Sequence, residues 1–111
     1  MDRSILLAHL RKTCFSPGDR NAALVDARRI AAYLRREFDA EVWGVGSLFE
    51  GIRPFLKQSD IDLVAHGIPP GRYIAAYARA SDMTRWKLDL IPLETANDLL
   101  REIVESKGVR L

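Results

Sequence analysis

The stretch that decides the fold is Ser59-Asp60-Ile61-Asp62-Leu63-Val64. Aliphatic residues alternate with aspartates here, and successive side chains of a β-strand point to opposite faces of the sheet. Ile61 and Leu63 can therefore enter a core, while Asp60 and Asp62 share the other face. Two carboxylates held side by side repel each other, so this face favours a bound cation or an extra proton. The pattern predicts a strand that carries acidic chemistry on one side.

A divalent metal ion is the expected partner of these carboxylates. Mg²⁺ prefers oxygen ligands and is usually held by one or two carboxylates together with substrate phosphates. Upstream, the apolar run of residues 42–45 leads into Gly46-Ser47, where a strand gives way to a turn. Backbone N–H groups at such a turn suit phosphate oxygens; Gly46 lets the backbone come close and Ser47 adds a hydroxyl. The two segments together predict a site for a metal ion and a phosphate.

A second alternating segment covers residues 85–91. The alternation places its tryptophan and two leucines on one face and Asp89 on the other. Lys87, two residues earlier, falls on the face of Asp89. It is either a counter-ion for carboxylates without a metal or an ordinary surface lysine.

Gly46-Ser47-Leu48-Phe49-Glu50-Gly51, followed by Ser59-Asp60-Ile61-Asp62-Leu63, resembles the Gly-Ser, then Asp-x-Asp signature of the polymerase-β-type nucleotidyltransferases. More specifically, the chain resembles the stand-alone minimal nucleotidyltransferases of that superfamily. They carry a third carboxylate on a later strand, and residues 87–94, with Asp89, are similar to that segment. The likeness runs from about residue 42 to the C-terminus. It implies an α/β fold with a small mixed β-sheet of three to four strands backed by helices, the polymerase-β-type nucleotidyltransferase core.

The resemblance also implies a role for each motif residue. Asp60, Asp62 and Asp89 are expected to be catalytic and to hold Mg²⁺, with two ions. Gly46 and Ser47 are expected to bind the β- and γ-phosphates of the nucleotide, with ATP as the default substrate. An acceptor hydroxyl would attack the α-phosphate in line, and pyrophosphate would leave.

Two departures from the family pattern concern phosphate binding. Twelve residues, 48 to 59, separate Ser47 from Asp60, so the loop is longer than the family's. The family often has a basic residue before the second glycine, where this chain has Glu50, and an acid there would repel a triphosphate unless it points away. Arg53 and Lys57 in the loop are candidate substitutes for phosphate binding, or else solvated loop cations.

The resemblance further implies a partner. Minimal nucleotidyltransferases are often encoded beside a small helical HEPN-type protein, frequently a toxin ribonuclease, which they silence by transferring AMP to a tyrosine. The chain is therefore expected to be an antitoxin that transfers AMP from ATP to a HEPN-type toxin. Two alternatives stay open: a catalytically weak antitoxin that neutralises its partner by complex formation, and a nucleotidyltransferase acting on a small molecule. A homo-oligomer or a hetero-oligomer is compatible with either.

Length and composition fit this interpretation. A chain of 111 residues is one domain, expected as an N-terminal helix (1–15) and a core (16–111), and its 48% hydrophobic and 29% charged residues are ordinary for a globular protein. The net charge of +2 does not by itself argue for nucleic acid, and we expect no direct nucleic-acid binding. A single cysteine, Cys14, and the lack of a signal-like or membrane-spanning stretch favour the cytoplasm.

Helices are expected between the strands. Ser16 is the expected N-cap of a long helix over residues 17–37, with Asp19 completing a capping-box variant. A short helix after Ser47 is expected to continue until Pro54.

The C-terminal half predicts two further helices. The first, over residues 73–81, is expected to bury Tyr73, Ile74 and Tyr77. Pro92 is expected to break the strand before it, and Thr95 with Asp98 predicts another capping box. The last helix is expected to bury Leu99, Leu100, Ile103 and Val104. Gly108 should end it, and residues 109–111 are expected to add an edge strand.

Overall fold

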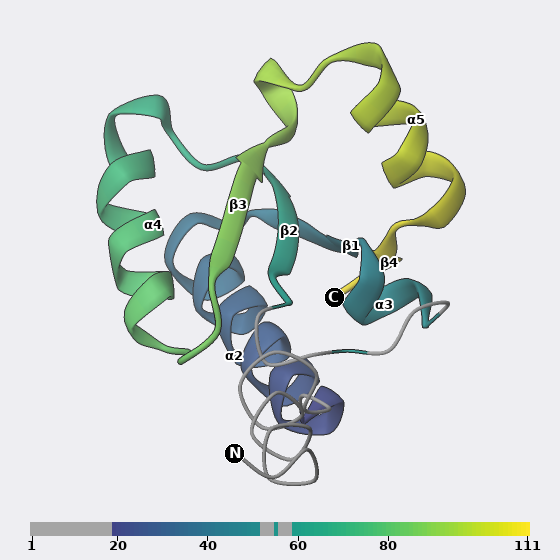
Figure 1. Ribbon diagram of the computed structural model, residues 1–111. Helices are drawn as coiled ribbons and strands as arrows, with labels where there is room; N and C mark the ends of the chain where they lie inside the picture. The colour runs from purple at the N-terminus through teal and green to yellow at the C-terminus, as the bar shows by residue number, and fades with distance from the viewer. Residues whose placement is uncertain (1–18, 52–54, 56–58) are drawn as a thin grey trace, which may run out of the picture.

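A four-stranded mixed sheet organises the molecule (Figure 1). The computed structural model describes residues 19–51, 55 and 59–111. The strands are β1 (Glu41–Val45), β2 (Ile61–His66), β3 (Leu88–Pro92) and β4 (Val109–Arg110), in the order β3-β2-β1-β4. β2 and β3 are parallel, whereas β1 is antiparallel to both β2 and β4. The predicted small mixed sheet and its C-terminal edge strand are confirmed.

Helices cover both faces of this sheet. On one face, α2 (Arg20–Phe38) and α4 (Tyr73–Asp82) pack over the main apolar cluster. On the other face, α5 (Asp98–Lys107) covers a smaller cluster built on Val45, Val64 and Val104. α4 supplies the crossover that a parallel pair such as β2 and β3 requires. Figure 1 shows α2 behind the sheet and α5 on the opposite side from α4.

The period-2 pattern of β2 accounts for the main core. Ile61, Leu63 and Ala65 are at most 1% exposed, and in the parallel register Ile61 and Leu63 lie beside Leu88 and Leu90 of β3. These side chains lie in one cluster with buried residues of α2. Because successive side chains alternate, the same pairing sends Asp62 and Asp89 to the opposite face.

Contacts between side chains and backbone fix the helices on the sheet. The Tyr77 hydroxyl of α4 donates a hydrogen bond to the Leu88 carbonyl of the edge strand β3. The Thr84 hydroxyl, just after α4, donates to Asp26 Oδ2 of α2 at 2.9 Å. These bonds tie β3 and the segment before it to the helical layer, and so fix the strand that carries Asp89.

Helix starts differ from the prediction. α2 begins at Arg20, and Asp19 is its N-cap because the Asp19 carboxylate accepts from the Ala22 N–H at 3.0 Å. Ser16 is therefore not the cap of this helix. α5 begins after Asn97, whose side chain accepts from the Leu100 N–H at 2.9 Å. Thr95 instead ends the 3₁₀ turn η2 (Leu93–Thr95).

On two helices the predicted apolar face is confirmed in part, since Tyr73 and Tyr77 of α4 pack against the main cluster and Leu100 and Ile103 of α5 pack against the smaller one. One residue on each face was predicted wrongly. Ile74 of α4 is 82% exposed, and the buried positions of that helix are Ala76 and Ala80. Leu99 of α5 is 66% exposed, although Val104 is buried. The positions of α4 that face the core are therefore held by two alanines together with the partly buried Tyr73 and Tyr77.

The remaining bounds are close to those predicted. A 3₁₀ turn, η1 (Pro70–Arg72), precedes α4, and Gly108 is the C-cap of α5 as expected. Pro92 is the last residue of β3 rather than a residue beyond it, which an edge strand tolerates. The expected N-terminal helix, Cys14 and the loop residues Arg53 and Lys57 lie outside the described residues. Within the described ranges, no helix is long and apolar enough to cross a membrane.

Candidate active site

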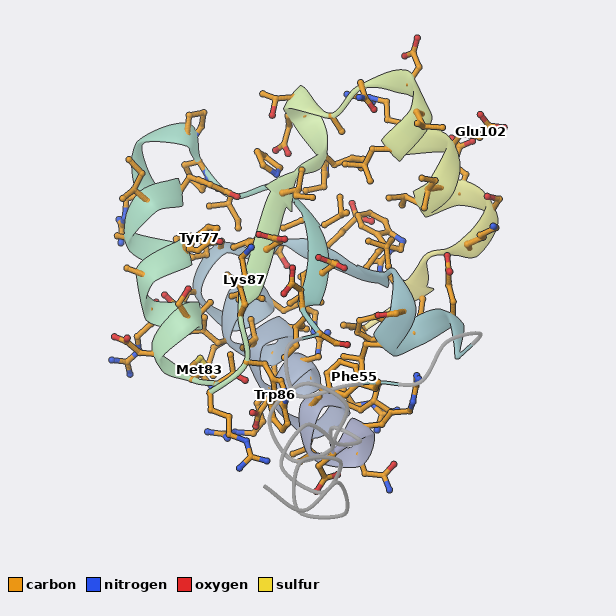
Figure 2. All side chains as sticks on the ribbon, in the orientation of Figure 1. Phe55, Tyr77, Met83, Trp86, Lys87 and Glu102 are labelled. Atoms are coloured by element: carbon orange, nitrogen blue, oxygen red, sulfur yellow. The ribbon has the colours of Figure 1, made fainter. Side chains whose placement is uncertain are left out.

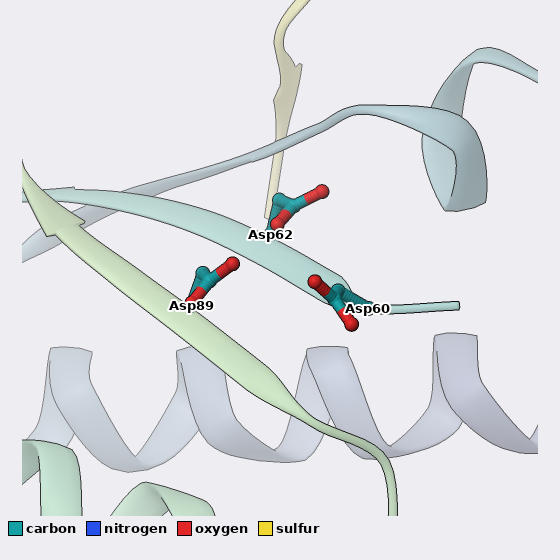
Figure 3. A group of neighbouring side chains, drawn as sticks. All are labelled: Asp60, Asp62 and Asp89. Carbon is teal, nitrogen blue, oxygen red and sulfur yellow. The ribbon is translucent and has the colours of Figure 1, made fainter. Parts of the chain in front are cut away.

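Three aspartates gather at one end of the sheet (Figure 3). Asp62 on β2 and Asp89 on β3 are direct partners in the parallel register. Asp60 precedes β2, beside the bond in which the Ile61 N–H donates to the Lys87 carbonyl at 2.9 Å. One carboxylate oxygen from each aspartate lies within 4.8 Å of the others. The structure thus brings together the three carboxylates that the sequence singled out.

The charge of this cluster is costly without a cation. Burial, then the negative charges of Asp89 and Asp60, raise the pKa of Asp62 from 3.8 to about 6, and a side-chain hydrogen bond with Asp89 acts in the same direction. The positive charge of Lys87 lowers it in part. Half-buried carboxylates at this spacing, with oxygen as the only donor atom, suit a hard divalent cation such as Mg²⁺.

Lys87 lies at the edge of the cluster. Its Nζ is 3.8 Å from Asp60 Oδ2, and its side chain is 71% exposed. An exposed pair of this kind contributes little to stability. Of the two roles open to Lys87, its position fits the counter-ion for carboxylates that hold no metal.

The Gly46 turn packs directly against the cluster. Gly46 has φ +82° and ψ −165°, a backbone conformation that only glycine adopts readily. A Cβ built on it would lie 2.6 Å from Asp62 Oδ2. β1 ends at Val45, the register partner of Asp62, so the turn leaves the sheet beside the carboxylates. Gly46 therefore leaves room for the Asp62 carboxylate as well as for a turn.

A single helical turn follows, α3 (Ser47–Glu50), with Ser47 half-buried at its start. The N–H groups of Phe49 and Glu50 both donate to the Gly46 carbonyl, at 3.1 and 2.9 Å. Gly51, at φ +71°, ends the turn in a left-handed cap, so Pro54 is not what stops it. Glu50 is exposed. The two loop cations predicted to replace the family's basic residue are not among the described residues.

Sequence reasoning missed two residues that hold this turn. Gly44 in β1 lies under the Phe49 ring, leaving no space for a Cβ. Arg20 at the start of α2 donates to the carbonyls of Ser47 and Leu48. A glycine inside a strand is a recognisable signal of close approach. The Arg20 contact joins residues 27 and 28 positions apart, and no local pattern reveals it.

Known proteins resemble this chain in structure only. No family model matches it, and no curated protein matches it in sequence. A solved toxin–antitoxin with AMP-PNP is similar at TM-score 0.63 and 19% identity, covering 76% of this chain and 70% of that chain. A mutant of the MntA–HepT toxin–antitoxin with two aspartate-to-glutamate substitutions has the same TM-score and coverage at 16% identity.

The MntA–HepT toxin–antitoxin itself is similar at TM-score 0.58 and 16% identity, over 78% of this chain and 69% of that chain. Identities this low show the fold alone. The fold that the chain shares with these toxin–antitoxin structures is a small mixed α/β arrangement, as the sequence motifs predicted.

Proposed function

We propose that the chain is a metal-dependent nucleotidyltransferase that transfers AMP from ATP to a tyrosine hydroxyl of a HEPN-type toxin, and so acts as an antitoxin. The observation that carries the proposal is the cluster of Asp60, Asp62 and Asp89 packed against the Gly46 turn. Phosphoryl and nucleotidyl transfer require carboxylates that can hold divalent cations beside the place where phosphates bind.

We assign the three aspartates roles as metal ligands according to their positions. Asp60, just before β2, and Asp62, within it, would hold the divalent metal ions. Asp89, on the neighbouring strand β3, would complete the ligand set. Mg²⁺, when bound, neutralises phosphate charge and lowers the pKa of a coordinated hydroxyl. The proton that the raised pKa of Asp62 favours must leave before the carboxylate can serve as a ligand.

The turn and the acceptor complete the proposed reaction. Gly46 and Ser47 would hold the β- and γ-phosphates, so that the α-phosphate lies over the carboxylates. The tyrosine oxygen then forms a bond to the α-phosphorus while the bond to the β-phosphate oxygen breaks. Pyrophosphate leaves, and the hydroxyl proton passes towards Asp89. The protein contributes chiefly alignment and charge stabilisation.

The structural likenesses support the choice of partner and nucleotide. The similar structures are toxin–antitoxins, one of them holds AMP-PNP, and another was studied with two aspartates changed to glutamate. We place the reaction in the cytoplasm, as the single cysteine indicates.

The test is transfer of label from ATP. The purified chain is incubated with Mg²⁺, α-labelled ATP and the protein encoded beside it, and the labelled residue is found by mass spectrometry. Asp60→Ala is expected to lose about 100-fold or more in rate. Asp82→Ala removes an exposed aspartate at the end of α4 and should transfer AMP like the wild type.

Equal labelling by Asp60→Ala and the wild type would refute the proposal. If no protein is labelled but both forms still bind the neighbouring protein tightly, the chain neutralises its partner by contact alone.

A further inference from the structure

Arg20 joins the start of α2 to the single turn α3. Its NH1 donates to the Ser47 carbonyl at 3.1 Å and to the Leu48 carbonyl at 2.6 Å, both from a part-buried position. The guanidinium also lies 5.9 Å from the centre of the Phe55 ring, a side chain that is only 3% exposed. One side chain therefore connects three segments that are distant in the sequence.

Local helix energetics do not favour an arginine at this position. Arg20 is the first residue of α2, and the first turn of that helix contains no acidic residue. The N-terminal end of a helix carries a partial positive charge, so a cation there is unfavourable by a few tenths of a kcal/mol or more. The contacts with α3 offset this cost, because a charged donor makes stronger hydrogen bonds than a neutral one.

The turn α3 needs outside support. It has four residues, far fewer than an isolated helix requires in water, and its last carbonyls have no partner within the turn. Among the described residues, the Ser47 carbonyl accepts one further bond besides that from Arg20, a 3.3 Å bond from the Gly51 N–H. Arg20 thus supplies the donors that a longer helix would have supplied itself.

The end of α2 from which Arg20 reaches is itself anchored in the core. Ala23 and Ala27, in the next turns of the helix, are fully buried. Phe55, below the guanidinium, packs against Trp86 with ring centres 6.0 Å apart, and both lie beside the first turns of α2 in Figure 2. A rigid support of this kind can fix the place of α3 relative to the sheet.

We propose that Arg20 is a positioning residue for the Gly46-Ser47 turn. Because Phe49 and Glu50 are bonded to the Gly46 carbonyl, α3 and Gly46 move together, and Arg20 holds both against Asp62. Without Arg20, the distance between the Gly46-Ser47 turn and the carboxylates is no longer fixed. The inference rests on the proposed function where it concerns ATP, and on geometry alone where it concerns the order of α3.

The experiment compares Arg20→Gln and Arg20→Lys with Arg28→Gln. Arg28 lies on the same helix and is exposed. Its replacement gives the same loss of charge, and among the described residues no hydrogen bond or ion pair joins it to α3. Amide hydrogen exchange of the free protein is measured at Phe49, Glu50 and Gly51, with the amides of β2 as an internal reference for global folding. AMP transfer is then measured as a function of ATP and, separately, of acceptor protein.

Arg20→Gln is expected to speed exchange in α3 while the β2 amides stay protected. It should lower kcat/KM for ATP by about 10- to 100-fold and leave the KM for the acceptor unchanged, which a general loss of stability would not do. Arg20→Lys keeps the charge and a donor, so both properties should recover in part. Arg28→Gln should match the wild type in every measurement.

Protection of the α3 amides in Arg20→Gln equal to that in the wild type would overturn the inference, whatever the activity. So would equal losses in Arg20→Gln and Arg28→Gln. If Arg20→Gln does not fold, Arg20→Lys must show intermediate exchange, and wild-type exchange there counts against the inference. A wild-type chain that transfers no AMP refutes the proposed function instead, and the exchange comparison still decides whether Arg20 orders the turn.

Discussion

The two faces of β2 differ in what holds their side chains. On the face under α2, Ile61, Leu63 and Ala65 are almost fully excluded from water and are fixed by packing. On the opposite face, Val64 is buried in the α5 cluster but Asp62 is half-buried beside two other carboxylates. One strand thus supplies stability on one face and, at its N-terminal end, a charged cluster on the other. Because alternate residues of β2 point to opposite faces, stability and the charged cluster can be changed by substitutions at different positions.

The largest effect is expected on the packed face. Leu63→Ala should lower the free energy of unfolding by about 2–5 kcal/mol, because Leu63 is fully buried and its removal leaves a cavity. Urea denaturation measures this loss. Leu99→Ala, at a 66% exposed position of α5, should stay within about 0.5 kcal/mol of the wild type. Equal losses at the two positions would mean that burial does not decide the stability of this fold.

Alternation was the strongest signal in the sequence, and it located both faces. The stretch Ser59–Val64 predicted the strand that is observed as β2 (Ile61–His66), and the face of Asp89 followed from the same rule. Period 2 leaves only two orientations, and a row of aliphatic residues chooses between them. The alternation therefore predicted that the three carboxylates lie on the same face of the sheet.

Helix orientation and helix ends could not be predicted equally well. The helical period says which residues share a side but not how closely that side approaches its neighbour, so Ile74 was placed in the core that Ala76 and Ala80 occupy. The N-caps of α2 and α5 were predicted wrongly for a related reason. Several residues near each start could accept the free N–H groups, and tertiary packing selects among them; Asp19 and Asn97 are the caps observed. The Arg20 contact is wholly tertiary.

A middle-sized effect tests the contact between the turn and the cluster. Gly46→Ala forces a side chain into positive φ and within 2.6 Å of Asp62 Oδ2. We expect a loss of about 1–3 kcal/mol in stability from the strained backbone and weaker Mg²⁺ binding because the carboxylate is displaced. Calorimetry and denaturation measure the two effects.

Gly51→Ala is the matched control for this change. Gly51 also has positive φ, but a Cβ there meets no atom of the described part of the chain within 4 Å. It should reproduce the loss of stability and leave Mg²⁺ affinity unchanged. If the two variants bind Mg²⁺ equally, the Gly46 turn does not shape the cluster.

The smallest effect concerns the loss of stability caused by repulsion among the carboxylates around Asp62. Because the pKa of Asp62 is about 6 in the folded chain against an ordinary 3.8, the folded state binds more protons than the unfolded state between these values. The contribution of Asp62 to the free energy of unfolding therefore falls as pH rises from about 4 to about 6, and it stays low above pH 6. In metal-free buffer at pH 7, Asp62→Asn should be more stable than the wild type. Screening of a half-exposed group limits the gain to about 1 kcal/mol.

Mg²⁺ should reverse that ranking. A ligand that binds only the folded state stabilises it by about 1.4 kcal/mol at ten times its dissociation constant, and Asp62→Asn lacks one of the carboxylates that would hold the ion. Thermal unfolding at pH 4 and pH 7, with and without Mg²⁺, measures all four states, and Asp82→Asn controls for loss of an exposed charge. If Asp62→Asn is less stable than the wild type in metal-free buffer at pH 7, then Asp62 makes favourable contacts that outweigh the repulsion among the three carboxylates. The contrast between the two faces of β2 would then be one of exposure alone.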